Sequence, residues 1–223
     1  CMAMTIIYPG MDWNGTLVNT LDKTINGKDN ANYPPSANNA SKTALTWRKY
    51  LDEQYANGIW NTNACPIVIR YAEVLLTYAE AVNELSGPSA DVYDKLDLIR
   101  GRVGMPKVDR EKYASKETLR RLIRRERGVE LAGEGVRRAD ILRWKDDNGK
   151  MVAETVLNGV LERVVGTVNY AETDPTKRAE IDTNAPATDK KIEDRVFKVH
   201  NRYNPIPQGA IDNNPNLEQN PGY

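Results

Sequence analysis

The sequence has little cysteine, histidine or phenylalanine and no excess of either charge. Its 223 residues include two Cys, one His and one Phe, and 31 basic residues balance 31 acidic ones. Two cysteines are too few for a disulfide framework, and one histidine leaves a zinc site without ligands. A net charge of zero gives no electrostatic argument for binding nucleic acid or an anionic membrane surface. We therefore expect no metal, no cofactor and no nucleic-acid partner, and whether Cys1 and Cys65 pair stays open.

Long hydrophobic runs and catalytic signatures are also missing. No stretch approaches the roughly eighteen apolar residues of a membrane-spanning helix, and no charged-then-apolar signal segment opens the chain. The sequence contains no Gly-x-Ser-x-Gly turn and no phosphate-binding Gly-x-x-x-x-Gly-Lys loop. The carboxylate pair of a glycosidase is defined by a separation in space, which a sequence does not show. These absences favour a binding protein over an enzyme.

What the chain does contain changes in character along its length. Residues 1–65 are rich in Asn, Thr, Tyr and Trp, which predicts loops, short strands and a brief helix over residues 45–55. Residues 66–145 have the apolar spacing of helices. Residues 146–202 form an irregular insertion, and residues 203–223 are a proline-rich tail.

Two helices are predicted at the start of the helical segment. Apolar side chains recur every three to four positions over residues 67–85, as in an amphipathic helix, and Gly87-Pro88 ends it. Ser89 is expected to cap a second helix, and the short link makes the two an antiparallel pair. The second helix carries one apolar stripe, formed by Val92, Leu96 and Ile99.

A third helix is predicted to begin near Ser115, and a shorter one covers residues 136–144. Beyond them the pattern is less specific. Residues 151–165 fit either a helix or a strand. Residues 167–194 are polar, typical of a surface loop, and residues 195–199 alternate like a short strand.

The densest charge lies in residues 120–130. One interpretation is a basic nucleic-acid helix, and another is an acid–base pair formed by Glu126 and Glu130. Acidic residues interrupt the basic ones, which favours a third interpretation, a scaffold of ion pairs. Arg127 precedes Glu130 by three residues, and Glu134 precedes two arginines by three and four, the separations that place side chains side by side on a helix.

The proline-rich tail contains four prolines, which rule out a continuous helix over its length. Its aromatic and aliphatic residues give it something to bury, which disordered segments usually lack. We therefore favour a tail packed against a folded body over a disordered one. The expected anchors are Tyr203, Ile206, Ile211, Leu217 and Tyr223.

The aromatic residues are the best candidates for binding. A sugar ring presents an apolar face that stacks on Trp or Tyr, while Asn and Asp bond its hydroxyls. Trp13 and Asn14 lie in a turn-prone stretch, and Trp60 has a similar setting. With Tyr8 they form the predicted ligand-binding set. Trp47 fits either a packed or an exposed position, and Trp144 is expected to be packed.

Four blocks of sequence resemble the C-terminal part of the SusD/RagB family of outer-membrane nutrient-binding lipoproteins of Bacteroidetes. They are IRYAEVLLTYAEA at residues 69–81, IRGRVGMP at 99–106, IRRERGVELAGEG at 123–135 with Asp140, Arg143 and Trp144 after it, and a tail with NPIP at 204–207 and a closing PGY. They stand in the family's order. Gly128 and Gly133 stand where larger side chains are common, which would loosen the third helix.

The resemblance implies a mostly α fold of tetratricopeptide-like helical pairs, with long irregular loops and minor short β-strands, and residues 1–223 as one C-terminal domain. It implies a non-enzymatic protein that binds a glycan and docks on a SusC-like TonB-dependent transporter. It places the protein on the surface of the outer membrane, held by a lipid anchor that this fragment lacks. The alternatives are a peptide-nutrient binder and a helical-repeat protein-interaction module.

Overall fold

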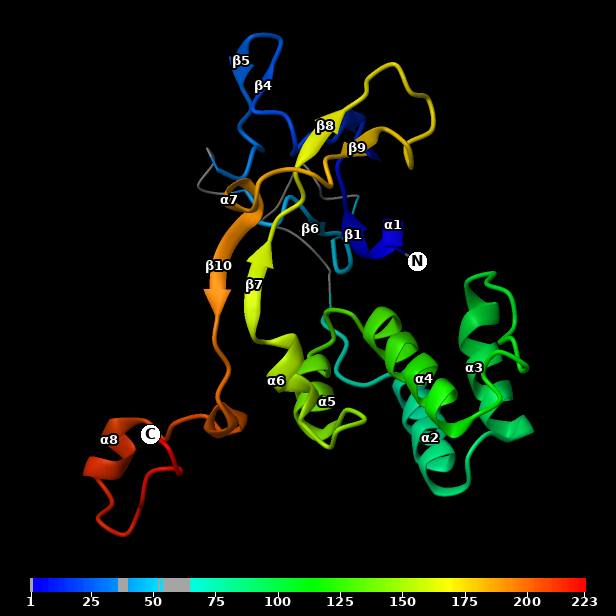
Figure 1. Ribbon diagram of the computed structural model, residues 1–223, viewed down its shortest axis with the longest axis vertical. Helices are drawn as coiled ribbons and strands as arrows, with labels where there is room; N and C mark the ends of the chain where they lie inside the picture. The colour runs from blue at the N-terminus through cyan, green and yellow to red at the C-terminus, as the bar shows by residue number, and fades with distance from the viewer. Residues whose placement is uncertain (1, 36–39, 52, 54–64) are drawn as a thin grey trace. The chain divides into compact units, whose positions relative to one another are not determined.

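The computed structural model describes residues 2–35, 40–51, 53 and 65–223 (Figure 1). The chain divides into two compact units that interleave along the sequence. Helices dominate and the strands are short, as the predicted fold class requires. Unit 1 comprises Cys1–Thr20, Leu45–Arg137 and Val168–Ala179, and unit 2 comprises Leu21–Ala44, Arg138–Thr167 and Glu180–Tyr223.

Three helices form the core of unit 1: α2 (Tyr71–Ser86), α3 (Ala90–Arg102) and α4 (Lys116–Glu130). α2 packs against both of the others. The predicted caps are confirmed, because the Ser89 side chain accepts from the Val92 N–H and Ser115 forms a capping box with Thr118. The buried core includes Leu75, Leu76, Ala79, Val92, Leu96, Ile99, Leu119, Leu122, Ile123 and Leu131.

The buried face of α2 differs from the predicted stripe. The helix begins at Tyr71, so residues 67–70 precede it. Tyr71 and Leu85 are 70% and 85% exposed, although both belong to the three-to-four pattern. Leu75, which belongs to the pattern, is buried, and so are Leu76 and Ala79, which do not, because α3 and α4 cover their side of the helix. Apolar residues lie on more than one side of α2, and the sequence does not say which side is covered.

The N-terminal part of unit 1 consists of short elements. After α1 (Met2–Thr5), β1 (Ile6–Ile7) pairs with β6 (Thr46–Trp47), and β2 (Asp12–Trp13) pairs with β3 (Thr16–Leu17). The helix predicted over residues 45–55 is therefore wrong at Thr46–Trp47, where long-range pairing with β1 selects a strand. Residues 52, 54 and 55 lie outside the described part of the chain.

Unit 2 has its own small hydrophobic core, to which two short helices contribute residues. α5 (Arg137–Arg143), which begins at the unit boundary, precedes α6 (Val152–Val156). Trp144, predicted to be packed, is 3% exposed, and the core it joins also contains Ile141, Ala153 and Phe197. The unit also contains the two-stranded sheet of β4 (Thr24–Ile25) and β5 (Lys28–Asp29).

The irregular insertion is more ordered than its composition predicts. Residues 151–165, left open between helix and strand, contain both α6 and β7 (Gly159–Glu162). The predicted loop 167–194 holds β9 (Ala179–Ile181), which pairs with β8 (Gly166–Val168), and also α7 (Ala187–Lys190). The strand predicted at residues 195–199 lies earlier in the chain. It is β10 (Lys191–Arg195), which ends at Arg195 and pairs antiparallel with β7. A 3-10 helix, η2 (Val199–Arg202), follows.

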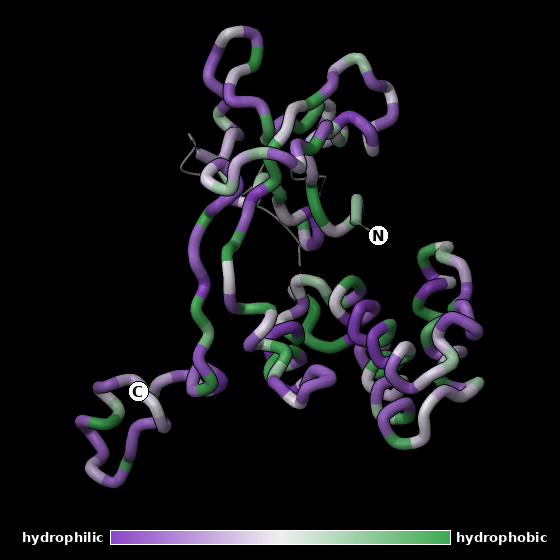
Figure 2. The backbone as a smooth tube through the Cα atoms, viewed as in Figure 1, coloured by the Kyte–Doolittle hydropathy of each residue, from purple (hydrophilic) through white to green (hydrophobic). Residues whose placement is uncertain are grey.

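The tail closes on itself through side chains that bond backbone groups. The Gln219 side chain bonds both the N–H and the C=O of Ile206, at 2.8 and 3.0 Å, and the Tyr223 hydroxyl donates to Tyr203 O at 2.9 Å. Arg138 of α5 donates to Asn201 O at 3.1 Å. Short hydrophobic stretches alternate with hydrophilic ones here (Figure 2), and α8 (Gln208–Asp212) is the tail's one helix among the described residues. Tyr203 and Tyr223 remain about half exposed, so the packing of the whole tail on the helical core stays a prediction.

Candidate functional site: an aromatic hairpin and the cavities around α4

The predicted binding residues Tyr8, Trp13 and Asn14 lie in and just before the β2–β3 hairpin. Asn14 and Gly15 form its turn with φ values of 48° and 73°, which suit the two central positions of a type I′ turn. The Trp13 ring is partly exposed, and the Arg48 guanidinium lies 5.0 Å from its centroid. Tyr8 is half-buried and Asn14 is exposed. Trp60 lies outside the described residues.

The hairpin is held by an arginine from far along the chain. Arg178 donates to the Asp12 carboxylate at 2.9 Å and to Gly10 O at 3.2 Å. Gly10 has a φ of 89°, and a Cβ there would lie 2.9 Å from that of Arg178, so only glycine allows this approach. The hairpin is therefore anchored while its tip stays open to solvent.

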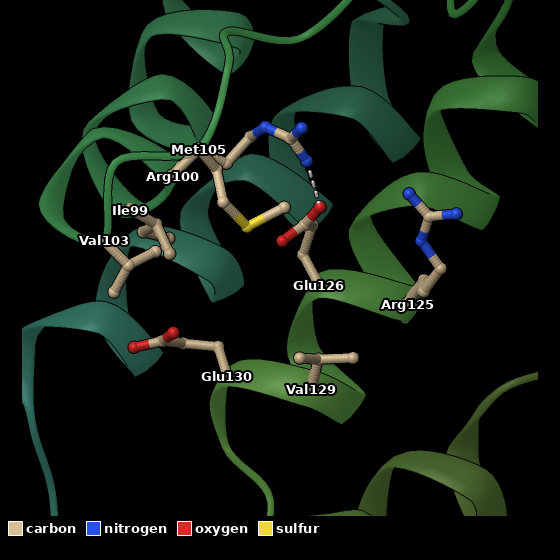
Figure 3. Close-up of a pocket in the computed structure, with 8 residues that line it drawn as sticks. All are labelled: Ile99, Arg100, Val103, Met105, Arg125, Glu126, Val129 and Glu130. Carbon is tan, nitrogen blue, oxygen red and sulfur yellow. Dashed lines mark hydrogen bonds and ion pairs between the residues drawn. The ribbon is translucent and has the colours of Figure 1, made fainter. Parts of the chain in front are cut away.

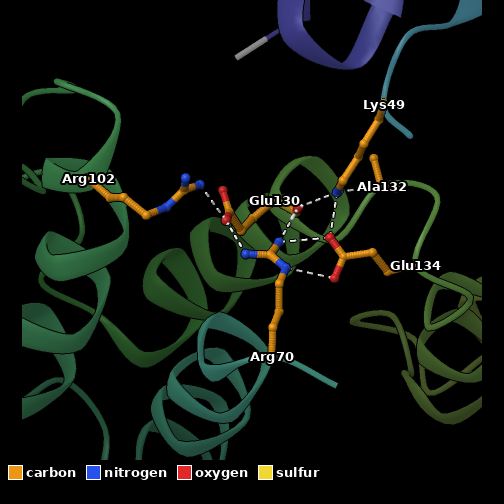
Figure 4. A network of polar contacts seen from close by, with 6 residues as sticks. All are labelled: Lys49, Arg70, Arg102, Glu130, Ala132 and Glu134. Carbon is orange, nitrogen blue, oxygen red and sulfur yellow. Dashed lines mark hydrogen bonds and ion pairs between the residues drawn. The ribbon is translucent and has the colours of Figure 1, made fainter. Parts of the chain in front are cut away.

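The charged segment forms a cluster that joins four parts of unit 1 (Figure 4). Arg70, just before α2, contacts Glu130 at 2.6 Å and Glu134 at 2.7 Å. Arg102, at the end of α3, contacts Glu130 at 2.8 Å. Lys49 contacts Glu134 and donates to Ala132 O at 2.9 Å.

The cluster confirms the ion-pair scaffold but corrects its geometry. We predicted neighbours along one helix, whereas these contacts join separate segments. Arg127 likewise reaches across to Glu80 of α2, at 3.7 Å. Sequence spacing indicates local pairs only, so these tertiary partners had no sequence signal.

The cluster fixes the charge of its members. Burial alone would raise the pKa of Glu134, but hydrogen bonds and charge attraction from Arg70 and Lys49 outweigh burial and hold its pKa below the ordinary 4.5. Burial alone would lower the pKa of Arg70, and its bonds to Glu134 and Glu130 raise it instead. Both groups are therefore ionised near neutral pH.

Acid should weaken this cluster. Because the pKa of Glu134 is lower in the folded state, its contribution is complete above pH 4.5 and is lost as pH falls through the lowered value. We expect Glu134→Gln to reduce the loss of stability between about pH 5 and about pH 2, where such carboxylates titrate. Urea unfolding midpoints measured across this range test the expectation. A pH dependence identical to wild type would contradict it.

Several cavities surround the second half of α4. One, of about 260 Å³, contains the Arg100–Glu126 ion pair at 2.5 Å (Figure 3). Another, of about 540 Å³, lies beside Arg70 and Glu130. The acid–base interpretation of Glu126 and Glu130 gains nothing from these cavities, because arginines hold both carboxylates in ion pairs.

A third cavity, of about 470 Å³, was missed by sequence reasoning. Its lining is Trp47, Arg124, Arg125, Gly128, Val129, Ala132, Gly133 and Arg137. The sequence allowed either a packed or an exposed position for Trp47. In the structure Trp47 is 54% exposed. Trp47 and the arginines are about eighty residues apart in the sequence, and the contacts of Lys49 with Glu134 and Ala132 O join the two segments. No local signal could therefore have found this cavity.

The two glycines noted in the sequence lie in this cavity. Gly128 is inside α4, and a Cβ there would lie 3.5 Å from Arg137 Nη1. Gly133 lies beyond the end of α4, with a φ of 77°, so the expectation that it loosens the helix is wrong. Its backbone makes a turn that glycine favours, beneath the Trp47 ring.

Comparison with known proteins assigns the chain. A model of the SusD family matches residues 2–223. The chain belongs to the SusD family. The resemblance seen in the four sequence blocks is thereby confirmed. Members of this family are nutrient-binding proteins of the cell surface rather than enzymes, and they act with a SusC-type partner.

Individual relatives give the same result. The SusD-like protein P25 of Formosa agariphila is 34% identical over 154 residues, which cover 64% of this chain and 29% of that protein. A solved SusD-like protein of Bacteroides fragilis superimposes with a TM-score of 0.68 at 24% identity, covering 98% of this chain and 37% of that one. A SusD homologue of Bacteroides thetaiotaomicron gives 0.58 at 22%, covering 99% and 40%. The chain thus spans well under half the length of these relatives.

Two further observations complete the site. In the described part of the chain, no group of three or more His, Cys, Asp or Glu side chains is arranged to hold a metal ion. Across the same residues, every helix is too short or too polar to cross a membrane. Cys65 is exposed, and Cys1 lies outside the described residues.

Proposed function

We propose that this SusD-family protein binds a nutrient glycan at the bacterial surface and delivers it to a SusC-like TonB-dependent transporter, without catalysis. The match of the family model to residues 2–223 carries the proposal. The proposed location is the outer face of the outer membrane, where a lipid anchor would hold the full-length protein.

The residues that we propose for ligand contact are Tyr8, Trp13 and Asn14, together with Trp60. A partly exposed indole beside an exposed amide offers a sugar an apolar surface and hydrogen-bonding groups together. The anchoring of the hairpin by Arg178 supports this choice, because a rigid surface loses less entropy on binding.

A glycan array followed by calorimetry on the full-length gene product tests the function. Binding of one polysaccharide class, with no release of shorter products, is the expected result. Failure to bind any glycan or peptide would contradict it. Copurification of a transporter without glycan affinity would indicate a protein-interaction module, and release of products would indicate an enzyme.

Trp13→Ala is expected to weaken glycan binding about tenfold, because it removes a stacking surface. The melting temperature should change little, since the partly exposed contact with Arg48 contributes only about 1 kcal/mol. Trp13→Phe, which keeps an aromatic ring, should recover part of the affinity. A large fall in melting temperature with unchanged affinity would instead make Trp13 a structural residue.

A further inference from the structure

The cavity beside Trp47 combines an aromatic side chain with a concentration of positive charge. Three of its eight lining residues, Arg124, Arg125 and Arg137, carry guanidinium groups, and among the described residues that line it there is no Asp or Glu. The neighbouring cavities differ, because each includes Glu130 in its lining. The described lining of the Trp47 cavity thus contributes three arginines, of which Arg125 is exposed, within a chain whose overall net charge is zero.

The positions of the arginines follow from the helices that carry them. Arg124 and Arg125 are successive residues of α4, and Arg137 begins α5 after the glycine-containing turn. Arg137 extends over Gly128, where a Cβ would make an ordinary van der Waals contact with the guanidinium. Arg125 is exposed and lies apart from the Arg100–Glu126 pair (Figure 3).

The remaining lining is apolar. Trp47 lies over Gly133, with ring atoms 3.5 Å from where a Cβ would be, so the turn backbone supports one side of the indole. Val129 and Ala132 complete the apolar part. With a volume of about 470 Å³, the cavity falls in the size range of small-molecule sites. A simple inorganic anion would need neither this volume nor an aromatic wall.

We propose that this cavity binds an acidic saccharide, with a sugar ring stacked on Trp47 and a sulfate ester or carboxylate held by the arginines. Guanidinium groups bind planar or tetrahedral oxyanions with paired hydrogen bonds, better than lysine does. The inference rests on the proposed function, because it names the class of glycan, and it adds a second contact site to the hairpin around Trp13.

The experiment measures binding of matched oligosaccharides to the full-length gene product by calorimetry. One set shares a backbone and differs only in being neutral, sulfated or carboxylated. We expect the acidic forms to bind at least about tenfold more tightly than the neutral form. This difference in binding free energy corresponds to one charge-assisted hydrogen bond. Comparing the sulfated and carboxylated forms identifies which anion the arginines prefer. Raising NaCl from about 0.05 M to about 0.5 M should weaken the acidic forms selectively, because salt screens exposed charges.

Variants locate the site. Trp47→Ala and Arg125→Gln should each weaken binding of the acidic form about tenfold, and Trp47→Phe should recover much of the loss. Arg202→Gln is the matched control, because Arg202 is also an exposed arginine beside an aromatic ring, 4.8 Å from Tyr203, and lies outside the cavity. It should bind like wild type. Circular dichroism confirms that each variant is folded.

Three outcomes would overturn the inference. Equal affinity for neutral and acidic forms would remove the charge preference while leaving glycan binding intact. Unchanged affinity of folded Trp47→Ala and Arg125→Gln would place the acidic glycan elsewhere. Equally tight binding of a single-stranded oligonucleotide of the same charge would show a general polyanion surface. Absence of binding to every saccharide would instead reject the proposed function itself.

Discussion

Glu134→Ala is expected to destabilise the protein by about 3 kcal/mol. The Glu134 side chain is 3% exposed and contacts both Arg70 and Lys49. Removing it leaves two partly buried cations that lack their carboxylate, and breaking one side of a buried pair costs more than the pair contributes. Because Lys49 follows β6 and Arg70 precedes α2, the loss should also loosen the attachment of the β1–β6 sheet to the helices.

Urea unfolding followed by circular dichroism measures this effect, since α2, α3 and α4 supply most of the helix signal. Glu193→Ala is the matched control: its side chain is 56% exposed and contacts Arg195 at 3.3 Å, so it should cost less than about 1 kcal/mol. Glu134→Gln keeps the shape without the charge and should fall between the two. Equal losses for Glu134→Ala and Glu193→Ala would show that the cluster has no special role.

Leu76→Ala should be comparably severe, with a loss of about 2–5 kcal/mol. Leu76 is completely buried where α2 meets α3 and α4. The smaller side chain leaves a cavity that three packed helices close only partly. The same measurement of urea unfolding tests this expectation.

Leu85→Ala provides a close comparison, because it makes the same change on the same helix. Leu85 is 85% exposed, so its replacement should change stability by less than about 0.5 kcal/mol. The difference between the variants then reports burial rather than helix propensity. A large loss for Leu85→Ala would mean that the apolar side of α2 is covered in the full-length protein, as the sequence pattern originally predicted.

Local signals in the sequence were sufficient for the helices of unit 1. Ser89 and Ser115 mark two helix starts because each hydroxyl accepts from an N–H within the next turn. Gly87, with a φ of 81°, ends α2 where expected. These interactions span only a few residues, so the sequence contains all of the information they need.

Long-range contacts account for the features that sequence reasoning missed. Thr46–Trp47 is a strand because it pairs with residues forty positions earlier. The charged residues around Glu130 bond partners on other segments rather than on their own helix turn. The candidate site has the same division: the turn at Trp13 and Asn14 could be predicted from a turn-prone stretch, whereas the Trp47 cavity depends on residues distant in sequence.

The sequence by itself determined the family, the mainly helical class and the caps of the central helices, because these depend on short-range chemistry and on motifs in a fixed order. Only the tertiary structure decided which side of α2 is buried and which carboxylates meet which arginines. It also decided that Trp47 faces a cavity lined by three arginines. The reason is physical: burial and ion pairing depend on which surfaces meet in space, and many pairings of surfaces are compatible with one periodic pattern.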